Sequence, residues 1–389
     1  MTRVDLVWFN AGGGHRAAAQ ALEQVMHAQG RPWQVRKLNL TEVLDPTRVF
    51  RRLTGIEPEE LYNKRLASGF TLGLAQELKL LQGLIRVSHA ALVQRLAAHW
   101  SQTQPDLVVS LVPNFNRAMH DGLAQARPGV PFVTVLTDMA DHPPSFWIEP
   151  GTRQHVVCGT EHAATQARAA GVPPGRLHRT SGMILRPDFY LPPTADRDSA
   201  RLAAGLDTHT PTGLVLFGGT GSSVMKRVAM RLPDTPLILM CGRNESLADQ
   251  LRALPCAGAP RVVVGHTPDV ARWMRLADFF IGKPGPGSLS EAVQMGLPVL
   301  VTRNAWTMPQ ERWNTEWVKQ QGLGLVCRSF RQVRSAVDTL TADLPAYQLR
   351  VQQVNNRAVF EVPAILECIL AASRPAEVRW RSAAPVSPV

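Results

Sequence analysis

Three glycine-rich segments carry the residue types that could hold a phosphate or a sugar. They are residues 10–16 (NAGGGHR), 217–223 (FGGTGSS) and 282–292 (GKPGPGSLSEA). Each follows a short apolar run and precedes a helical pattern, so flexible backbone N–H groups and a helix N-terminus would face the same ligand. The chemistry predicted for such loops is the binding of an anion, above all a phosphate.

The first segment presents Gly13, Gly14 and His15 at the start of a helix. It is not G-x-G-x-x-G, and it lacks the lysine of a phosphate-binding P-loop. A tight strand-to-helix turn explains the glycines equally well. His15 tips the interpretation toward a ligand, because a histidine at a helix N-terminus could bond to a phosphate.

The second segment combines flexible glycines with hydroxyl groups at Gly219, Thr220, Gly221 and Ser222. A phosphate cradle explains this mixture better than a plain turn. A dinucleotide site would need a third glycine, where Val224 stands, and an acidic residue after the next strand, where residues 240–242 are Met-Cys-Gly. The sequence therefore argues against NAD.

In the third segment the prolines make the backbone rigid, and the glycines let a ligand approach it closely. Its candidate ligand-binding residues are Lys283, Gly285, Pro286, Gly287, Ser288 and Glu291. A helix is predicted to begin near Ser288, which makes another anion site. Glu291 then lies on the first helical turn, where its carboxylate suits paired ribose hydroxyls. Ser288 and Glu291 also fit a capping box, which needs no ligand.

Two residues are candidates for a general base. Asp138, at the end of a predicted strand, is the first and His15 the second. A solvated residue in a strand-end turn is the alternative for Asp138. The sequence has no Asp-x-Asp and no carboxylate cluster, so we expect no metal site. Lys283 and the helix N-termini would supply positive potential instead.

The composition limits the partners. The 389 residues suffice for two or three domains, and 42 basic against 31 acidic residues give a net charge of +11. This excess favours an anionic membrane surface or a phosphorylated substrate. No nucleic-acid motif is visible, and we expect no nucleic acid. The apolar runs are too short for a spanning helix or an export signal, and five scattered cysteines suit the cytosol.

Apolar runs alternate with helical patterns, which is typical of parallel β-α-β units. The strands predicted for a first sheet are residues 4–9, 33–38, 107–112, 132–136 and 155–157. Those predicted for a second sheet are residues 214–217, 237–240, 261–264, 279–281 and 298–302. The fold class predicted is α/β, with two Rossmann-like domains whose carboxyl sheet edges face each other across a cleft.

The expected boundaries are an acceptor- and membrane-binding domain at residues 1–185, a linker at 186–205, a donor domain at 206–350, a C-terminal helix at 351–372 and a loose tail at 373–389.

Residues 73–100 predict one helix with an apolar stripe at Leu74, Leu78, Leu81, Ile85, Leu92 and Leu96. A core helix is the favoured interpretation of that stripe. The segment before it, with Lys64, Arg65, Phe70 and Leu72, is a candidate membrane contact beside Lys79 and Arg86.

Together with residues 105–110 (PDLVVS), 136–143 and 308–314 (MPQERWN), the first and third segments resemble the monogalactosyldiacylglycerol synthases and the bacterial processive diacylglycerol glucosyltransferases. They are similar, more distantly, to the N-acetylglucosaminyltransferase that makes lipid II. The resemblance covers about residues 4–330. It implies the GT-B fold of glycosyltransferase family 28, a UDP-sugar bound mainly by the second domain and a lipid acceptor bound by the first.

The same resemblance implies roles for single residues. Gly219, Gly221 and Ser222 would approach the diphosphate, and residues 285–288 the nucleotide and phosphate, with Glu291 on the ribose. Gln310 and Glu311 would hold the hexose hydroxyls, helped by Asn314. His15 would lie near the donor phosphate or reaction centre, and the loop of His266 beside the uracil.

The sequence departs from the family pattern at three places. Val112 stands where relatives carry a histidine before proline, which excludes a catalytic role for that position and puts the acceptor pocket in doubt. Met308 and Pro309 replace a usual glycine, and Trp313 is unusual.

The predicted activity is an inverting transfer of a hexose from a UDP-sugar, without a further cofactor, to a lipid such as diacylglycerol. The enzyme would lie peripherally on the cytoplasmic face of the cell membrane. A UDP-sugar epimerase and a non-catalytic lipid- or nucleotide-binding protein of the same fold remain alternatives. The hexose, the lipid, processivity and the oligomeric state are left open by the sequence.

Overall fold

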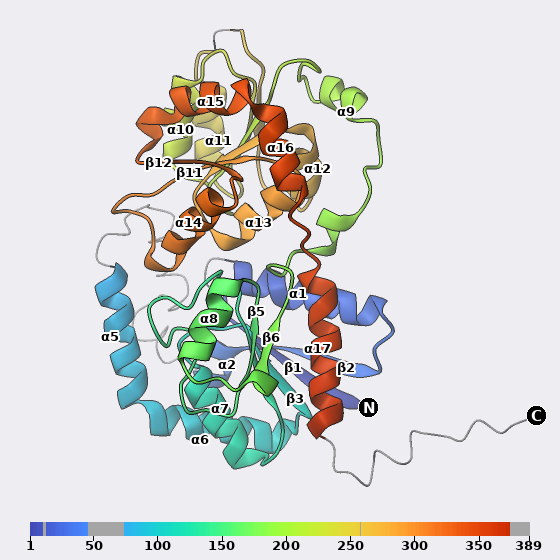
Figure 1. Ribbon diagram of the computed structural model, residues 1–389, viewed down its shortest axis with the longest axis vertical. Helices are drawn as coiled ribbons and strands as arrows, with labels where there is room; N and C mark the ends of the chain where they lie inside the picture. Colours follow the sequence, from blue (N-terminus) through green and yellow to red (C-terminus); the bar gives the residue numbers. More distant parts are fainter. Residues whose placement is uncertain (11–12, 46–73, 257, 374–389) are drawn as a thin grey trace, which may run out of the picture.

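Two series of short apolar strands form two separate parallel sheets of six strands each. The computed structural model describes residues 1–10, 13–45, 74–256 and 258–373 (Figure 1). The first sheet has the strand order β2-β1-β3-β4-β5-β6, and the second has the order β12-β11-β10-β7-β8-β9. All carboxyl ends of one parallel sheet lie at the same edge, so each sheet gathers its loops on one side.

The strands of the first sheet are β1 Thr2–Trp8, β2 Trp33–Asn39, β3 Leu107–Ser110, β4 Phe132–Val135, β5 His155–Cys158 and β6 Leu177–Arg179. Those of the second are β7 Gly213–Leu216, β8 Leu237–Met240, β9 Arg261–Val264, β10 Phe279–Gly282, β11 Val299–Thr302 and β12 Gly324–Cys327. The central strands are buried along their whole length because helices cover both faces.

The helices of the first domain are α1 Gly14–Ala28, α2 Leu40–Leu44, α5 Leu74–Val87, α6 His89–Thr103, α7 Asn116–Ala126 and α8 Glu161–Ala169. Those that follow are α9 Arg197–Ala203, α10 Val224–Arg231, α11 Glu245–Arg252, α12 Val270–Leu276, α13 Pro286–Gln294, α14 Arg312–Gln320, α15 Val333–Ala342, α16 Leu344–Gln352 and α17 Ala358–Ser373. Short 3-10 turns are η1 Pro174–Arg176, η2 Pro187–Tyr190, η3 Pro309–Glu311 and η4 Phe330–Gln332. No helix in the described ranges is long and apolar enough to cross a membrane.

The single helix predicted over residues 73–100 is two helices. α5 ends at Val87 and α6 begins at His89, so the predicted stripe does not lie on one continuous face. In α6, Leu96 is fully buried, as a core helix requires. In α5 the prediction of a core face fails, because Leu78 is buried but Leu81 is exposed.

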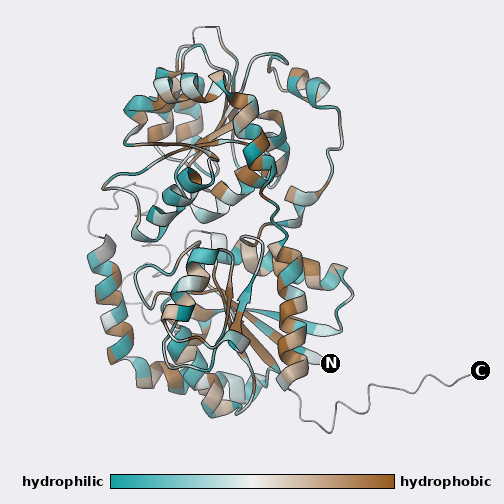
Figure 2. Ribbon diagram, in the orientation of Figure 1, coloured by the Kyte–Doolittle hydropathy of each residue, from teal (hydrophilic) through white to brown (hydrophobic). Residues whose placement is uncertain are grey.

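The last described helix returns to the first domain. In α17, Val359, Val362 and Leu366 are fully buried in the same apolar cluster as Val4 and Leu22. Arg31 and Glu367 form an ion pair beside this contact. Figure 2 colours most of α17 brown, in keeping with its role as a core element. The helix begins at Ala358, not at residue 351, because residues 351–352 belong to the end of α16.

The predicted linker is partly a structured part of the second domain. Arg201 of α9 is almost completely buried, and its guanidinium donates to Asp278 Oδ2 at 2.9 Å. Arg197 donates to the other oxygen of the same carboxylate at 2.7 Å. α9 is therefore anchored to the second domain, while η2 stands between the domains (Figure 1).

Candidate active site

His15 is held in the first turn of α1 by the glycine that precedes the helix. Gly13 has a φ of 80°, a left-handed conformation that favours glycine, and it caps α1 without a side-chain bond. His15 Nδ1 lies 3.0 Å from Thr137 Oγ1, and its ring stacks on Phe9 with ring centroids 4.9 Å apart. Burial lowers the pKa of His15 to about 4, against an opposing hydrogen bond to the Leu111 backbone. The imidazole is therefore neutral at pH 7.

Asp138 follows β4 at the same sheet edge, and it is buried. Trp147 Nε1 donates to Asp138 Oδ2 at 3.0 Å. Burial raises the pKa of Asp138 to about 7, the Trp147 bond opposes the rise, and the charges of Glu311 and Lys283 act in opposite directions. Asp138 is thus not a solvated turn residue, which settles the alternative left open by the sequence. It is poised between acid and carboxylate near neutral pH.

Trp147 joins the two catalytic candidates, and the sequence did not single it out. It is fully buried, and its ring centroid lies 5.9 Å from that of His15. Its backbone N–H donates to Asp141 Oδ1 at 2.7 Å, and its carbonyl accepts from Asn116 Nδ2 at 3.0 Å. No motif marks this tryptophan, because its role depends on a loop that folds back on the strand edge.

The second domain contributes a cation and a carboxylate to the same place. Lys283 Nζ lies 2.9 Å from Glu311 Oε1, and Glu311 is 4% exposed. Because both charges act on the pKa of Asp138, the carboxyl edges of the two sheets face each other here. A Cβ on Gly285 would lie 3.4 Å from Glu311 Oε1, so the glycine leaves room for this pair.

The third glycine-rich segment differs from its prediction at the helix start. α13 begins at Pro286, with Gly285 as its N-cap and no side-chain capping bond. Ser288 is therefore inside the first turn, and the predicted start near Ser288 is wrong. The capping box with Glu291 does not form, because neither residue occupies its position in that motif. Burial raises the pKa of Glu291 to about 6, against the opposing charge of Arg186.

Two buried amides come from residues 308–314. Asn314 is completely buried, and its Nδ2 donates to the Pro284 carbonyl at 2.7 Å. It therefore holds the loop in this structure. Gln310 is 5% exposed, and its Oε1 has no hydrogen-bond partner among the described residues. A buried acceptor without a donor is costly, so this oxygen is suited to a hydroxyl from a ligand.

The second glycine-rich segment is fixed by the turn after β8. Gly221 has a φ of 60°, and Ser222 Oγ accepts from the Val224 N–H at 3.3 Å as α10 begins. The Gly219 carbonyl accepts from the Arg243 N–H at 2.9 Å. Asn244 Nδ2 donates to the Thr220 carbonyl at 3.2 Å. The loop is thus a formed strand-to-helix connection with its glycines at the sheet edge.

The remaining candidates lie around these loops. Gly14 opens α1, and His266 is exposed after β9, the outer strand of the second sheet. Pro286 and Gly287 form the first turn of α13. Lys64, Arg65, Phe70 and Leu72 lie outside the described residues. No group of three or more potential metal ligands occurs within the parts of the chain that the structure describes.

Residues 15–182 match the family model of monogalactosyldiacylglycerol (MGDG) synthase. The chain is similar in sequence to the MGDG synthases. It is 26% identical over 352 residues to the chloroplastic MGDG synthase of Spinacia oleracea, a match that covers 86% of this chain and 65% of that protein. Against the probable MGDG synthase 2 of Oryza sativa subsp. indica it is 26% identical, with 92% of this chain and 79% of that protein covered.

Solved structures share the fold of this chain. The MurG structure from Acinetobacter baumannii aligns with a TM-score of 0.58 at 14% identity, covering 94% of this chain and 99% of the other. The rhamnosyltransferase SpnG, complexed with thymidine diphosphate, aligns with a TM-score of 0.60 at 13% identity, covering 95% and 100%. The fold is therefore GT-B, as predicted.

Proposed function

We propose that this protein is an inverting glycosyltransferase that moves a hexose from a UDP-sugar to a hydroxyl of a lipid such as diacylglycerol. The observation that carries the proposal is Asp138, buried with a pKa of about 7 and facing Lys283 and Glu311 across the cleft. A general base is most effective when its pKa lies near the working pH. The family relation supports the lipid acceptor, and the glycine loops support a diphosphate donor.

The transfer is a single displacement. Asp138 takes the proton of the acceptor hydroxyl as that oxygen bonds to the anomeric carbon. The bond from this carbon to the diphosphate oxygen breaks, and UDP leaves with the electron pair. Lys283 and the N-termini of α10 and α13 stabilise the charge that develops on UDP. Asp138 ends as the neutral acid and returns its proton to water.

The hexose would lie between this base and η3. Gln310 Oε1 accepts from a sugar hydroxyl, and Glu311, neutralised by Lys283, accepts from another. Glu291 is suited to the ribose hydroxyls because no capping box engages its carboxylate. His15 is neutral and hydrogen-bonded to Thr137, so we propose that it shapes the acceptor-binding side of the site. Proton transfer is assigned to Asp138.

A membrane-bound acceptor requires a protein that reaches the bilayer surface. In α5, four large apolar side chains are exposed, namely Leu80, Leu81, Leu84 and Val87. Lys79 and Arg86 are exposed on the same helix. This combination supports reversible attachment to an anionic membrane, in a peripheral position on its cytoplasmic face.

The test is a panel of UDP-hexoses assayed with diacylglycerol vesicles, with products resolved by mass spectrometry. We expect a glycolipid plus UDP, formed equally in EDTA, and no product from Asp138→Asn. Glu311→Ala should lose turnover while it still binds UDP, because the sugar contact is lost and the nucleotide contacts remain. Conversion of the UDP-sugar to another UDP-sugar without lipid would instead assign an epimerase. A UDP complex without turnover on any donor or lipid would assign a binding protein.

A further inference from the structure

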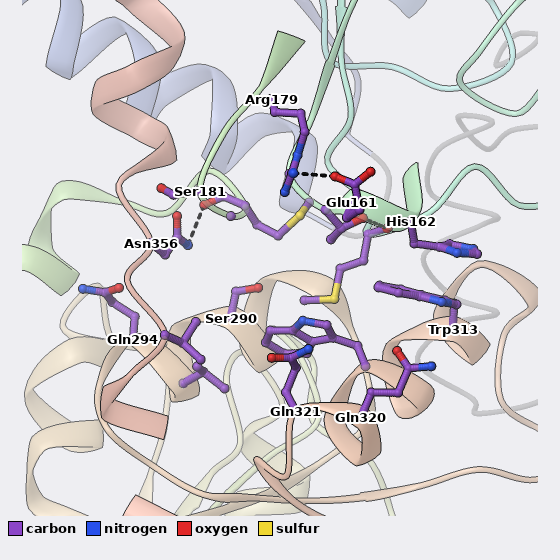
Figure 3. A pocket seen from close by; sticks show the side chains of 18 of the residues that line it. Glu161, His162, Arg179, Ser181, Ser290, Gln294, Trp313, Gln320, Gln321 and Asn356 are labelled. Atoms are coloured by element: carbon purple, nitrogen blue, oxygen red, sulfur yellow. Dashed lines mark hydrogen bonds and ion pairs between the residues drawn. The ribbon is translucent and has the colours of Figure 1, made fainter. Parts of the chain in front are cut away.

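A cavity of about 550 Å³ lies between the domains, beside the reaction centre, and the third glycine-rich segment reaches it at Ser290. The first domain contributes α8, Met139 and the end of β6, and the second contributes α13 and α14. Residues from the chain segments that cross between the domains, 181–183 and 353–356, also line it. Figure 3 shows this arrangement, with Asn356 and Ser181 at the crossing segments.

The walls of the cavity offer aromatic faces. Trp313 of α14 stacks on His162 of α8, with ring centroids 4.5 Å apart and planes inclined by 7° (Figure 3). This is a direct contact between the two domains. Trp317, one helical turn further on, also lines the cavity and is only partly buried. Flat apolar rings are the surfaces on which the C–H faces of a sugar ring can pack.

The polar lining consists mostly of neutral amides. Four glutamines line the cavity, and their side chains have no hydrogen-bond partner among the described residues: Gln294, Gln320, Gln321 and Gln353. Each amide offers two donors and one acceptor, which match the hydroxyls of a sugar. Asn356, by contrast, is committed, because its Nδ2 donates to the Met183 carbonyl at 2.9 Å.

The charges of the cavity are balanced. The chain has 42 lysines and arginines, yet Arg179 is the one that lines this cavity, and it is paired with Glu161. Burial lowers the pKa of His162 and so disfavours its charged form. The N-terminus of α8 also lines the cavity, but Thr160 caps it and the acidic Glu161 occupies its first turn. A phosphate site would present uncompensated cations or an open helix N-terminus. The lining therefore favours an uncharged polar ligand.

We propose that this cavity binds a neutral hexose unit, packed on Trp317 and hydrogen-bonded by the surrounding glutamines. Met139 follows Asp138 directly, and Trp313 lies two residues after Glu311, so a bound sugar sits next to the transfer centre. Two sources share this chemistry, the headgroup of a glycosylated lipid and a free sugar. Sugar binding itself does not depend on the transfer activity; a link to the acceptor rests on the proposed function.

The test uses the full chain saturated with UDP, so that the donor loops are filled. Methyl β-galactoside and methyl β-glucoside are titrated by saturation-transfer NMR, with inorganic phosphate as the anionic comparison. We expect saturable binding of a hexoside in the millimolar range, weakened at least about tenfold by Trp317→Ala and by the pair Gln294→Ala and Gln321→Ala. Gln352→Ala is the matched control, because this exposed glutamine lies outside the cavity.

The glutamine pair keeps the test decisive should Trp317→Ala fail to fold, since neither glutamine side chain makes a hydrogen bond to the described residues. Hexoside binding that is absent from the wild type, unchanged in these variants or displaced by phosphate would overturn the proposal. Flotation with vesicles that contain galactosyl-diacylglycerol, against vesicles of diacylglycerol alone, separates the sources. If the glutamine-pair variant loses flotation only with the galactosyl-diacylglycerol vesicles, the ligand is the lipid headgroup. If the wild type floats equally with both kinds of vesicle, the ligand is a free sugar. UDP binding measured on the same samples reports the donor site independently.

Discussion

Trp147→Phe should move the pH dependence of turnover without removing the base. The indole N–H is the direct side-chain donor to Asp138, at 3.0 Å, and phenylalanine keeps the apolar ring but not the donor. The bond stabilises the ionised carboxylate, so its loss raises the pKa of Asp138. A hydrogen bond to a charged group contributes about 1.5–3 kcal/mol, and each pKa unit corresponds to about 1.4 kcal/mol.

The expected rise is therefore about one to two units above the value of about 7. At pH 7 the ionised fraction would fall from about one half to roughly 1–10%, which predicts about a five- to fiftyfold loss of kcat. Activity should recover as the pH rises through about 9, because the carboxylate is then restored. The groups that face Asp138 are Glu311, Lys283 and Asp141, and the variant leaves all three in place.

The assay is the pH profile of kcat for wild type, Trp147→Phe and Trp100→Phe. Trp100 is a matched control, because it is also fully buried in the first domain but interacts with Asp5. The Trp100→Phe variant therefore reports how much a buried void alone changes the activity. A Trp147→Phe enzyme with a uniform loss at every pH, or with the wild-type profile, would refute the role of this bond in setting the base.

Three further outcomes are expected. Asp138→Asn should abolish turnover yet raise the melting temperature at pH 8. Because the pKa of Asp138 is raised in the folded state, the folded state binds more protons than the unfolded state between about pH 4 and 7. The stability of the wild type therefore falls as the pH rises through this window, and an amide, which does not titrate, does not suffer this loss. Glu291→Ala should weaken UDP binding by about ten- to a hundredfold in calorimetry with little change in melting temperature; normal binding would remove the glutamate from the ribose. Leu81→Ser with Leu84→Ser should reduce flotation with anionic vesicles while UDP binding stays intact, and unchanged flotation would place the membrane contact elsewhere.

Most of the strands that the sequence predicted are buried, although the edge strands β2 and β9 were also predicted. Leu237–Met240 is apolar at every position, and burial on both faces of a parallel strand leaves that pattern in the sequence. The two strands that were missed, β6 and β12, lie at sheet edges. β6 is Leu-His-Arg, which is not an apolar run, and the apolar residues around β12 are interrupted by Gly322 and Gly324.

The candidate site was predictable where one segment supplies both loop and helix. The glycine segments and Lys283 lie at the sheet edges because a parallel strand must deliver its following loop there. The start of α13 was misplaced because Pro286 itself occupies the first helical position, where its missing N–H costs nothing. The bond from Trp147 to Asp138 and the stack of Trp313 on His162 depend on tertiary contacts, which leave no periodic or local signal.

The return of α17 to the first domain has a consequence for synthesis on the ribosome. Val359, Val362 and Leu366 complete a cluster whose other members, such as Leu22, were made more than 300 residues earlier. Until those late residues emerge, the nascent first domain exposes an apolar groove on α1, and domains usually fold in the order of their synthesis. The first domain should therefore finish folding after the second, with chaperone protection of that groove in between. A fragment that stops at residue 185 would carry the same exposed groove permanently, and it should aggregate unless α17 is supplied as a separate peptide.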